Sequence, residues 1–142
     1  MIFSRSLNLP ALLLAALAID IEPIFFGLHG FFHTFLGGIV GATALSGVLW
    51  LLRRPVNLVM AVAGVPYPAT FRSVWTGALF GFWIPVLLDS VVYSHLKPLF
   101  PFTFNPFYCA GSYPVVAFFC EVCAALAVFL LFIRLVRQKM RH

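Results

Sequence analysis

The chain has 142 residues, of which 63% are hydrophobic and only 9% are charged, and its mean hydropathy is +1.05. Because soluble globular domains carry charge on about a quarter of their residues, this composition excludes an ordinary soluble domain and predicts an integral membrane protein. The formal net charge of +5 does not indicate nucleic-acid binding, since the basic residues stand at the ends of apolar runs, as in bilayer proteins.

The first apolar run is expected to form a helix over residues 2–21, which is long enough to cross a bilayer. Pro23 disfavours the α conformation at the residue before it, so this helix should end near Ile21 with Asp20 in its last turn. A cleaved signal peptide is the alternative interpretation, because Arg5, an apolar stretch and small residues follow one another in the required order. Cleavage would remove the helix from beside Asp20.

Three further spans are expected over residues 29–52, 73–93 and 114–133, with a kink in the third at Pro85. The apolar segment 56–65 is too short to cross and is expected to lie at the membrane interface or against the bundle. Residues 94–113 are rich in Phe, Tyr and Pro and should form an aromatic outer loop. The predicted fold is therefore an all-α bundle of four transmembrane helices in one domain, residues 1–142.

The basic residues predict the orientation of this bundle. Eight of the nine Lys and Arg residues fall on the side that holds both termini and the loop between the second and third spans, and only Lys97 falls on the other side. Because basic residues accumulate in cytoplasmic loops, both termini are expected in the cytoplasm, with the protein in an inner membrane.

All four acidic residues and three of the four histidines are predicted at or near the outer ends of the spans: Asp20, Glu22, His29, His33, Asp89, His95 and Glu121. Several of them continue rows of small residues at steps of four, for example Gly77, Gly81, Pro85 and Asp89. Such rows form the faces along which membrane helices pack. We therefore expect His33, Asp89 and Glu121 to face one another, and ionisable residues at membrane depth usually mark a functional site.

The order and spacing of these residues resemble the YdjM-like, LexA-regulated family of inner-membrane metal-dependent hydrolases. That family has an aspartate motif at the end of its first helix, a His-Arg-Gly-x-Thr-His-Ser type motif, and a His-x-x-x-Asp motif before an aromatic, proline-rich stretch. The counterparts here are residues 20–23, 29–34 and 85–90, followed by 97–102 and 105–107. The arginine of the second motif is absent, and Pro85 stands where the family has a histidine, so His95 is the candidate substitute ligand.

The chemistry of these residue types agrees with that resemblance. Two histidines four residues apart on a helix can hold one metal ion, with a carboxylate as third ligand and an open position for water. We expect a divalent metal ion, with Zn²⁺ as the first candidate, bound by His29, His33 and Asp89. Asp20 would be a fourth ligand or would contact one of the ligands. Glu22 or Glu121 would act as general base. The Cys120–Cys123 pair has no second pair and indicates packing rather than a metal site.

A site at the outer interface, under an aromatic lid, suits an amphiphile, so the expected reaction is hydrolysis of a lipid-linked ester or phosphoester. A small transporter or ion-conducting subunit for a metal ion or protons is the main alternative. It would need a second polar layer in the cytoplasmic half, and the sequence has none. A structural membrane protein, whose polar residues only fix helix packing, is the third interpretation; it predicts no bound metal and normal folding after neutral substitution of the histidines.

Overall fold

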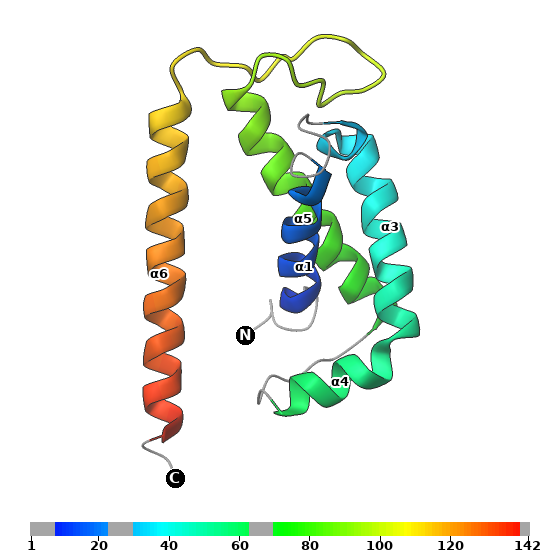
Figure 1. The fold of residues 1–142 in the computed structure, drawn as a ribbon, viewed down its shortest axis with the longest axis vertical. Helices are drawn as coiled ribbons and strands as arrows, with labels where there is room; N and C mark the ends of the chain where they lie inside the picture. Colours follow the sequence, from blue (N-terminus) through cyan, green and yellow to red (C-terminus); the bar gives the residue numbers. More distant parts are fainter. Residues whose placement is uncertain (1–7, 23–29, 63–69, 140–142) are drawn as a thin grey trace. The chain divides into compact units, whose positions relative to one another are not determined.

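The computed structural model describes residues 8–22, 30–62 and 70–139, and every regular element within them is helical (Figure 1). In chain order the elements are α1 (Leu9–Ile19), the 3-10 helix η1 (Phe31–His33), α3 (Phe35–Leu51), α4 (Arg53–Val62), α5 (Phe71–Val92) and α6 (Tyr113–Lys139). The predicted all-α class is confirmed. The chain divides into two compact units, Met1–Tyr108 and Cys109–His142, called here the first and second unit.

In the described part of the chain, α5 is the one helix that is long and apolar enough to cross a membrane. Its 22 residues match the expected span 73–93 to within two residues at each end. The other apolar helical stretches are shorter, at Leu9–Ile19, Phe35–Leu51 and Tyr113–Phe129. The beginning of the first expected span falls on residues 1–7, outside the described residues. The structure therefore supplies one clear span candidate, and the bundle of four spans stays a prediction.

The second expected helix, α3, begins at Phe35, so the prediction of this helix over residues 30–34 is wrong. The reason is Thr34, whose backbone is extended (φ −122°, ψ 154°) and whose Oγ1 accepts a hydrogen bond from Gly37 N at 2.8 Å. Threonine is a favoured N-cap because its hydroxyl satisfies a free N–H of the first turn. His33 is consequently held by η1, and residue 29 lies outside the described residues.

Helix α5 forms the centre of the first unit, because it packs against both α1 and α3, which contact each other only slightly (Figure 1). The approach to α1 is close: a Cβ on Gly77 would meet the carbonyl oxygen of Asn8, and one on Gly81 would meet that of Leu12. The core combines small and β-branched side chains with one aromatic ring, namely Ala15, Ile19, Ala42, Ala78, Val86 and Phe82. The predicted packing face of small residues on the third span is thus confirmed.

The aromatic segment after α5 is irregular, as predicted, and is tied to the helices beneath it. Asn105 Nδ2 donates to the carbonyl oxygens of Ser90 (2.7 Å) and Tyr93 (3.0 Å) at the end of α5. Phe35 N donates to Pro98 O at 2.9 Å. These bonds fix the segment over the end of the first unit at which α5 finishes and α3 begins.

Candidate functional site

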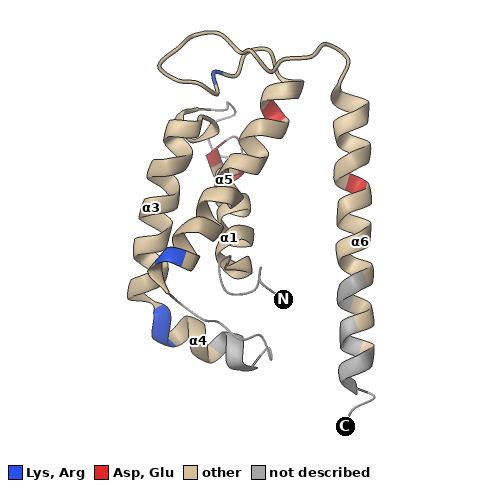
Figure 2. Ribbon diagram, turned by 180° about the vertical axis from the view of Figure 1, so that it is seen from behind, with Lys and Arg blue, Asp and Glu red and all other residues tan. Residues whose placement is uncertain are grey.

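The acidic residues of the first unit gather at one end of it (Figure 2). Asp20 is the C-cap residue of α1, Glu22 lies in the helical turn that follows, and Asp89 lies in the last turn of α5. The short helix η1 brings His33 to the same place. Three separate segments of the chain therefore contribute ionisable groups to one end of the unit, as the sequence predicts.

His33 lies between two carboxylates. Its Nδ1 is 3.1 Å from Glu22 Oε2, and its Nε2 is 3.7 Å from Asp89 Oδ2. The histidine side chain is only 1% exposed, while Glu22 is 15% and Asp89 30% exposed. The predicted juxtaposition of His33 and Asp89 is confirmed. We refer to Glu22, His33 and Asp89 below as the acidic cluster.

Glu22 accepts a hydrogen bond from the backbone and also contacts the imidazole of His33. Its Oε2 also accepts a hydrogen bond from Gly30 N at 3.1 Å. A side chain at position 30 would collide with this carboxylate, because a Cβ there would meet Glu22 Oε1. The contact between Glu22 and His33 was not anticipated from the sequence, which suggested Glu22 as a general base. Glu22 and His33 belong to separate segments of the chain, and periodicity within one helix does not predict contacts between segments.

Asp20 adds to the negative charge at this end. Its carboxylate lies near enough to act on Asp89 electrostatically, and the two repel each other. Asp20 itself is exposed, and its backbone N–H donates to Ala18 O as α1 ends. The buried imidazole of His33 thus stands in a region to which three carboxylates contribute negative potential, which is an environment that attracts a cation.

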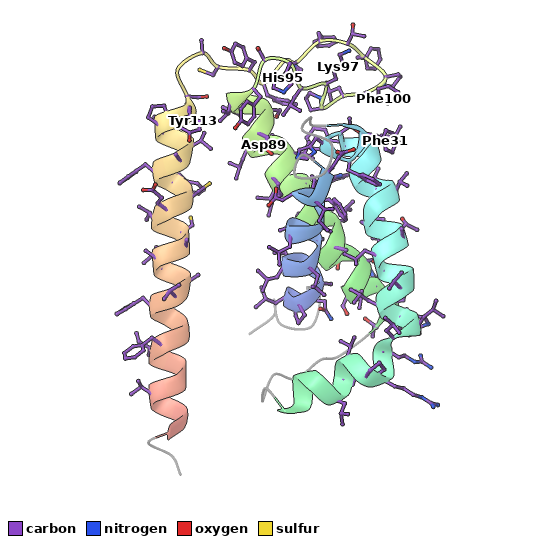
Figure 3. All side chains as sticks on the ribbon, viewed as in Figure 1. Phe31, Asp89, His95, Lys97, Phe100 and Tyr113 are labelled. Atoms are coloured by element: carbon purple, nitrogen blue, oxygen red, sulfur yellow. The ribbon has the colours of Figure 1, made fainter. Side chains whose placement is uncertain are left out.

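The remaining candidates are placed differently. His95 is exposed in the aromatic segment, with its ring 5.6 Å from that of Tyr93 (Figure 3). In the same view Phe31 and Phe100 lie beside each other, with ring centroids 6.0 Å apart. Glu121 is exposed on α6 in the second unit, and its predicted position beside His33 stays a prediction. Cys120 and Cys123 are exposed free thiols on the same helix.

The predicted metal ligands are brought together only in part. Among residues 8–22, 30–62 and 70–139, no three His, Cys, Asp or Glu side chains are arranged to hold a metal ion. His33 and Asp89 face each other, Asp20 is close to Asp89, and the fourth predicted ligand, His29, lies outside the described residues.

Comparison with protein-family models, with curated proteins and with solved structures finds no match for this chain. The function must therefore be argued from the acidic cluster and its surroundings.

Proposed function

We propose that the protein is a membrane-embedded metal-dependent hydrolase whose site is built around the acidic cluster. The substrate would be a lipid-linked ester or phosphoester at the outer face of the membrane. The observation that carries this proposal is the position of the buried His33 ring between the carboxylates of Glu22 and Asp89.

The hydrogen-bonding chemistry of that arrangement favours a cation. An ionised carboxylate only accepts hydrogen bonds, so Nδ1 of His33 must carry the proton that it donates to Glu22. In the neutral ring Nε2 then presents a lone pair toward Asp89, which is also an acceptor at 3.7 Å. A positive charge between the two groups, either a second proton or a metal ion, would stabilise this arrangement. A carboxylate that orients a histidine through Nδ1 is the usual outer partner of a metal-binding imidazole.

The donor types fit a divalent metal such as Zn²⁺, which binds histidine nitrogen together with carboxylate oxygen. His33 Nε2 and Asp89 would hold the ion, with Asp20 and His29 as the further ligands of the proposed set. A metal held there would polarise a phosphoryl or carbonyl oxygen and activate water near neutral pH. Glu22 would keep the ring of His33 in one tautomer and one orientation, while the general base would be Glu22 or Glu121. His95 remains the candidate substitute ligand.

The surroundings of the cluster support a lipid-linked substrate. Large apolar side chains are exposed on the helices of the first unit, among them Leu13 and Leu17 on α1, as expected of surfaces that face lipid. The aromatic segment exposes Phe102 (62%) and Phe104 (58%) above the end that holds the cluster. Aromatic residues are typical of the membrane–water boundary. We therefore propose the topology of four spans with cytoplasmic termini, which puts the cluster at the outer boundary.

A proton shared between Nε2 and Asp89 would satisfy the same geometry and would suit the alternative, a proton or metal-ion carrier. In the described part of the first unit the acidic residues stand at one end only (Figure 2), which favours a one-sided site over a conduction path. The test separates these functions. The metal content of the detergent-purified full chain is measured by mass spectrometry for the wild type, His33→Ala, Asp89→Asn and the terminal control His142→Ala.

About one metal ion per chain is expected in the wild type and in His142→Ala, and at least tenfold less in the other two variants. Hydrolysis of a chromogenic phosphodiester and of a chromogenic ester is then assayed with the same samples. Negligible metal in all four proteins would contradict the hydrolase and leave the proton carrier. Metal without hydrolysis of either probe would leave a metal-binding or transport function.

A further inference from the structure

The opposite end of the first unit carries three arginines around an aromatic pair. Arg53 lies over the Trp50 ring, with its Cζ 4.7 Å from the ring centroid. The same ring packs edge-to-face against Phe71, with centroids 6.0 Å apart and planes at 89°. Arg72 follows Phe71 directly at the start of α5. Trp50 therefore joins the end of α3, the start of α4 and the start of α5 at one point.

Helix α4 lies across this end of the unit. It departs from the direction of α3 immediately after Leu52 (Figure 1). Val56 packs against the buried cluster of Ala11, Leu49 and Val74, whereas Leu58 is 70% exposed. A short helix with arginines at its first residues and an exposed leucine beyond them has the character of a helix that lies in the plane of a membrane interface.

The charge of the three arginines is not neutralised within the described residues. Arg53, Arg54 and Arg72 are all exposed, and none of the ion pairs in the described ranges includes them. The acidic residues of the first unit stand at its other end (Figure 2). Exposed arginines at the starts of α4 and α5, one of them stacked on a tryptophan, are complementary to a phosphate at the depth of the lipid headgroups.

We propose that Arg53, Arg54 and Arg72 bind the phosphate of an anionic phospholipid, with Trp50 holding Arg53 in place at the membrane boundary. Guanidinium groups bind phosphate oxygens through paired, charge-assisted hydrogen bonds. Stacking on the indole ring limits the orientations of Arg53 before the lipid arrives. The site rests on the membrane placement given under the proposed function but not on the chemistry of the acidic cluster, which lies at the other end of the unit.

The test is native mass spectrometry of the detergent-solubilised full chain, titrated with phosphatidylglycerol and with phosphatidylcholine. The wild type is expected to bind phosphatidylglycerol at least tenfold more tightly than phosphatidylcholine. Each arginine near an anionic surface contributes roughly fivefold to affinity, so the variant Arg53→Gln/Arg54→Gln/Arg72→Gln should lose the preference almost completely. The matched control is Arg134→Gln/Arg137→Gln/Arg141→Gln, which removes the same net charge from the C-terminal segment and should keep the preference.

Equal binding of the two lipids by the wild type, or equal loss in both triple variants, would overturn the site. Competition by millimolar inorganic phosphate would also overturn it, because the arginines would then hold a free anion. Should the first triple variant not retain its helical circular dichroism, Arg54→Gln alone must weaken phosphatidylglycerol binding about fivefold. The metal content of the preparation does not enter this measurement, so its outcome and that of the hydrolase test are independent.

Discussion

At one end of the first unit His33 is 1% exposed between Glu22 and Asp89, whereas at the other end Arg53, Arg54 and Arg72 are all exposed. At the acidic end the imidazole contacts both carboxylates and is itself withdrawn from water. At the arginine end Arg53 stacks on the Trp50 ring, and all three arginines remain open to a partner. The ionisable groups of the acidic end are therefore stabilised by contacts within the unit, whereas the charges of the arginine end remain available to an external group. Substitutions at matched positions of the two ends test this contrast.

The largest effect is expected for His33→Ala. The substitution removes the hydrogen bond between Nδ1 and Glu22 and leaves a cavity in place of the buried ring, which together should cost about 3 kcal/mol of unfolding free energy. Arg53→Gln, at the exposed end, should cost less than about 0.5 kcal/mol. Denaturant unfolding of the purified chain in detergent measures both values. Similar losses of unfolding free energy for the two variants would contradict the contrast between a buried acidic end and an exposed arginine end.

The next effect concerns the helix contact that brings Asp20 and Asp89 to the same end. Gly81→Ala should destabilise the fold by about 2 kcal/mol, because its Cβ would press against Leu12 O and Ala15 Cβ and separate α1 from α5. Gly47→Ala is the matched control on α3, since a Cβ there meets nothing within 4 Å. It should stabilise the fold by about 0.5–1 kcal/mol. Thermal unfolding of both variants is the measurement, and a gain for Gly81→Ala would contradict the close packing.

A smaller effect is expected where the aromatic segment is attached over the acidic end. Asn105→Ala removes the donor to Ser90 O and Tyr93 O and should cost about 1.5 kcal/mol. Asn57→Ala, on the exposed side of α4, should change the stability by less than about 0.5 kcal/mol. Limited proteolysis should also cut the segment faster in Asn105→Ala than in Asn57→Ala. Equal cleavage rates would mean that the Asn105 bonds do not hold the segment.

The smallest contrast is between two tryptophans of α5. Trp83 Nε1 donates to the carbonyl oxygen of Phe35 at a partly buried position, whereas Trp75 Nε1 donates to Thr43 Oγ1 at an exposed one. Trp83→Phe should therefore cost about 1 kcal/mol and Trp75→Phe less than half of that. The difference is measured by denaturant unfolding. A larger loss for Trp75→Phe would reverse the assignment of burial along this helix.

The sequence predicts α5 well because its apolar run has clear limits, with a threonine cap before it and Tyr93 after it. It also predicts that His33 and Asp89 meet, since the orientation expected from the sequence puts both residues at the same end of the bundle. The start of α3 is missed because an apolar run does not reveal that Thr34 takes the capping conformation. The contact between Glu22 and His33 is missed for a different reason. It joins two separate segments, and the periodicity of each segment carries no information about the other.

The central claim is that side chains from the turn after α1, from η1 and from α5 form one coupled acidic cluster. A double-mutant cycle of His33→Ala with Asp89→Ala, followed by denaturant unfolding, tests it most directly. The account predicts a coupling energy of about 1–3 kcal/mol for this pair. It predicts additivity within about 0.5 kcal/mol for His33→Ala with Arg53→Gln, because α3, about 25 Å long, separates those positions. Additive effects in the first cycle would contradict the claim.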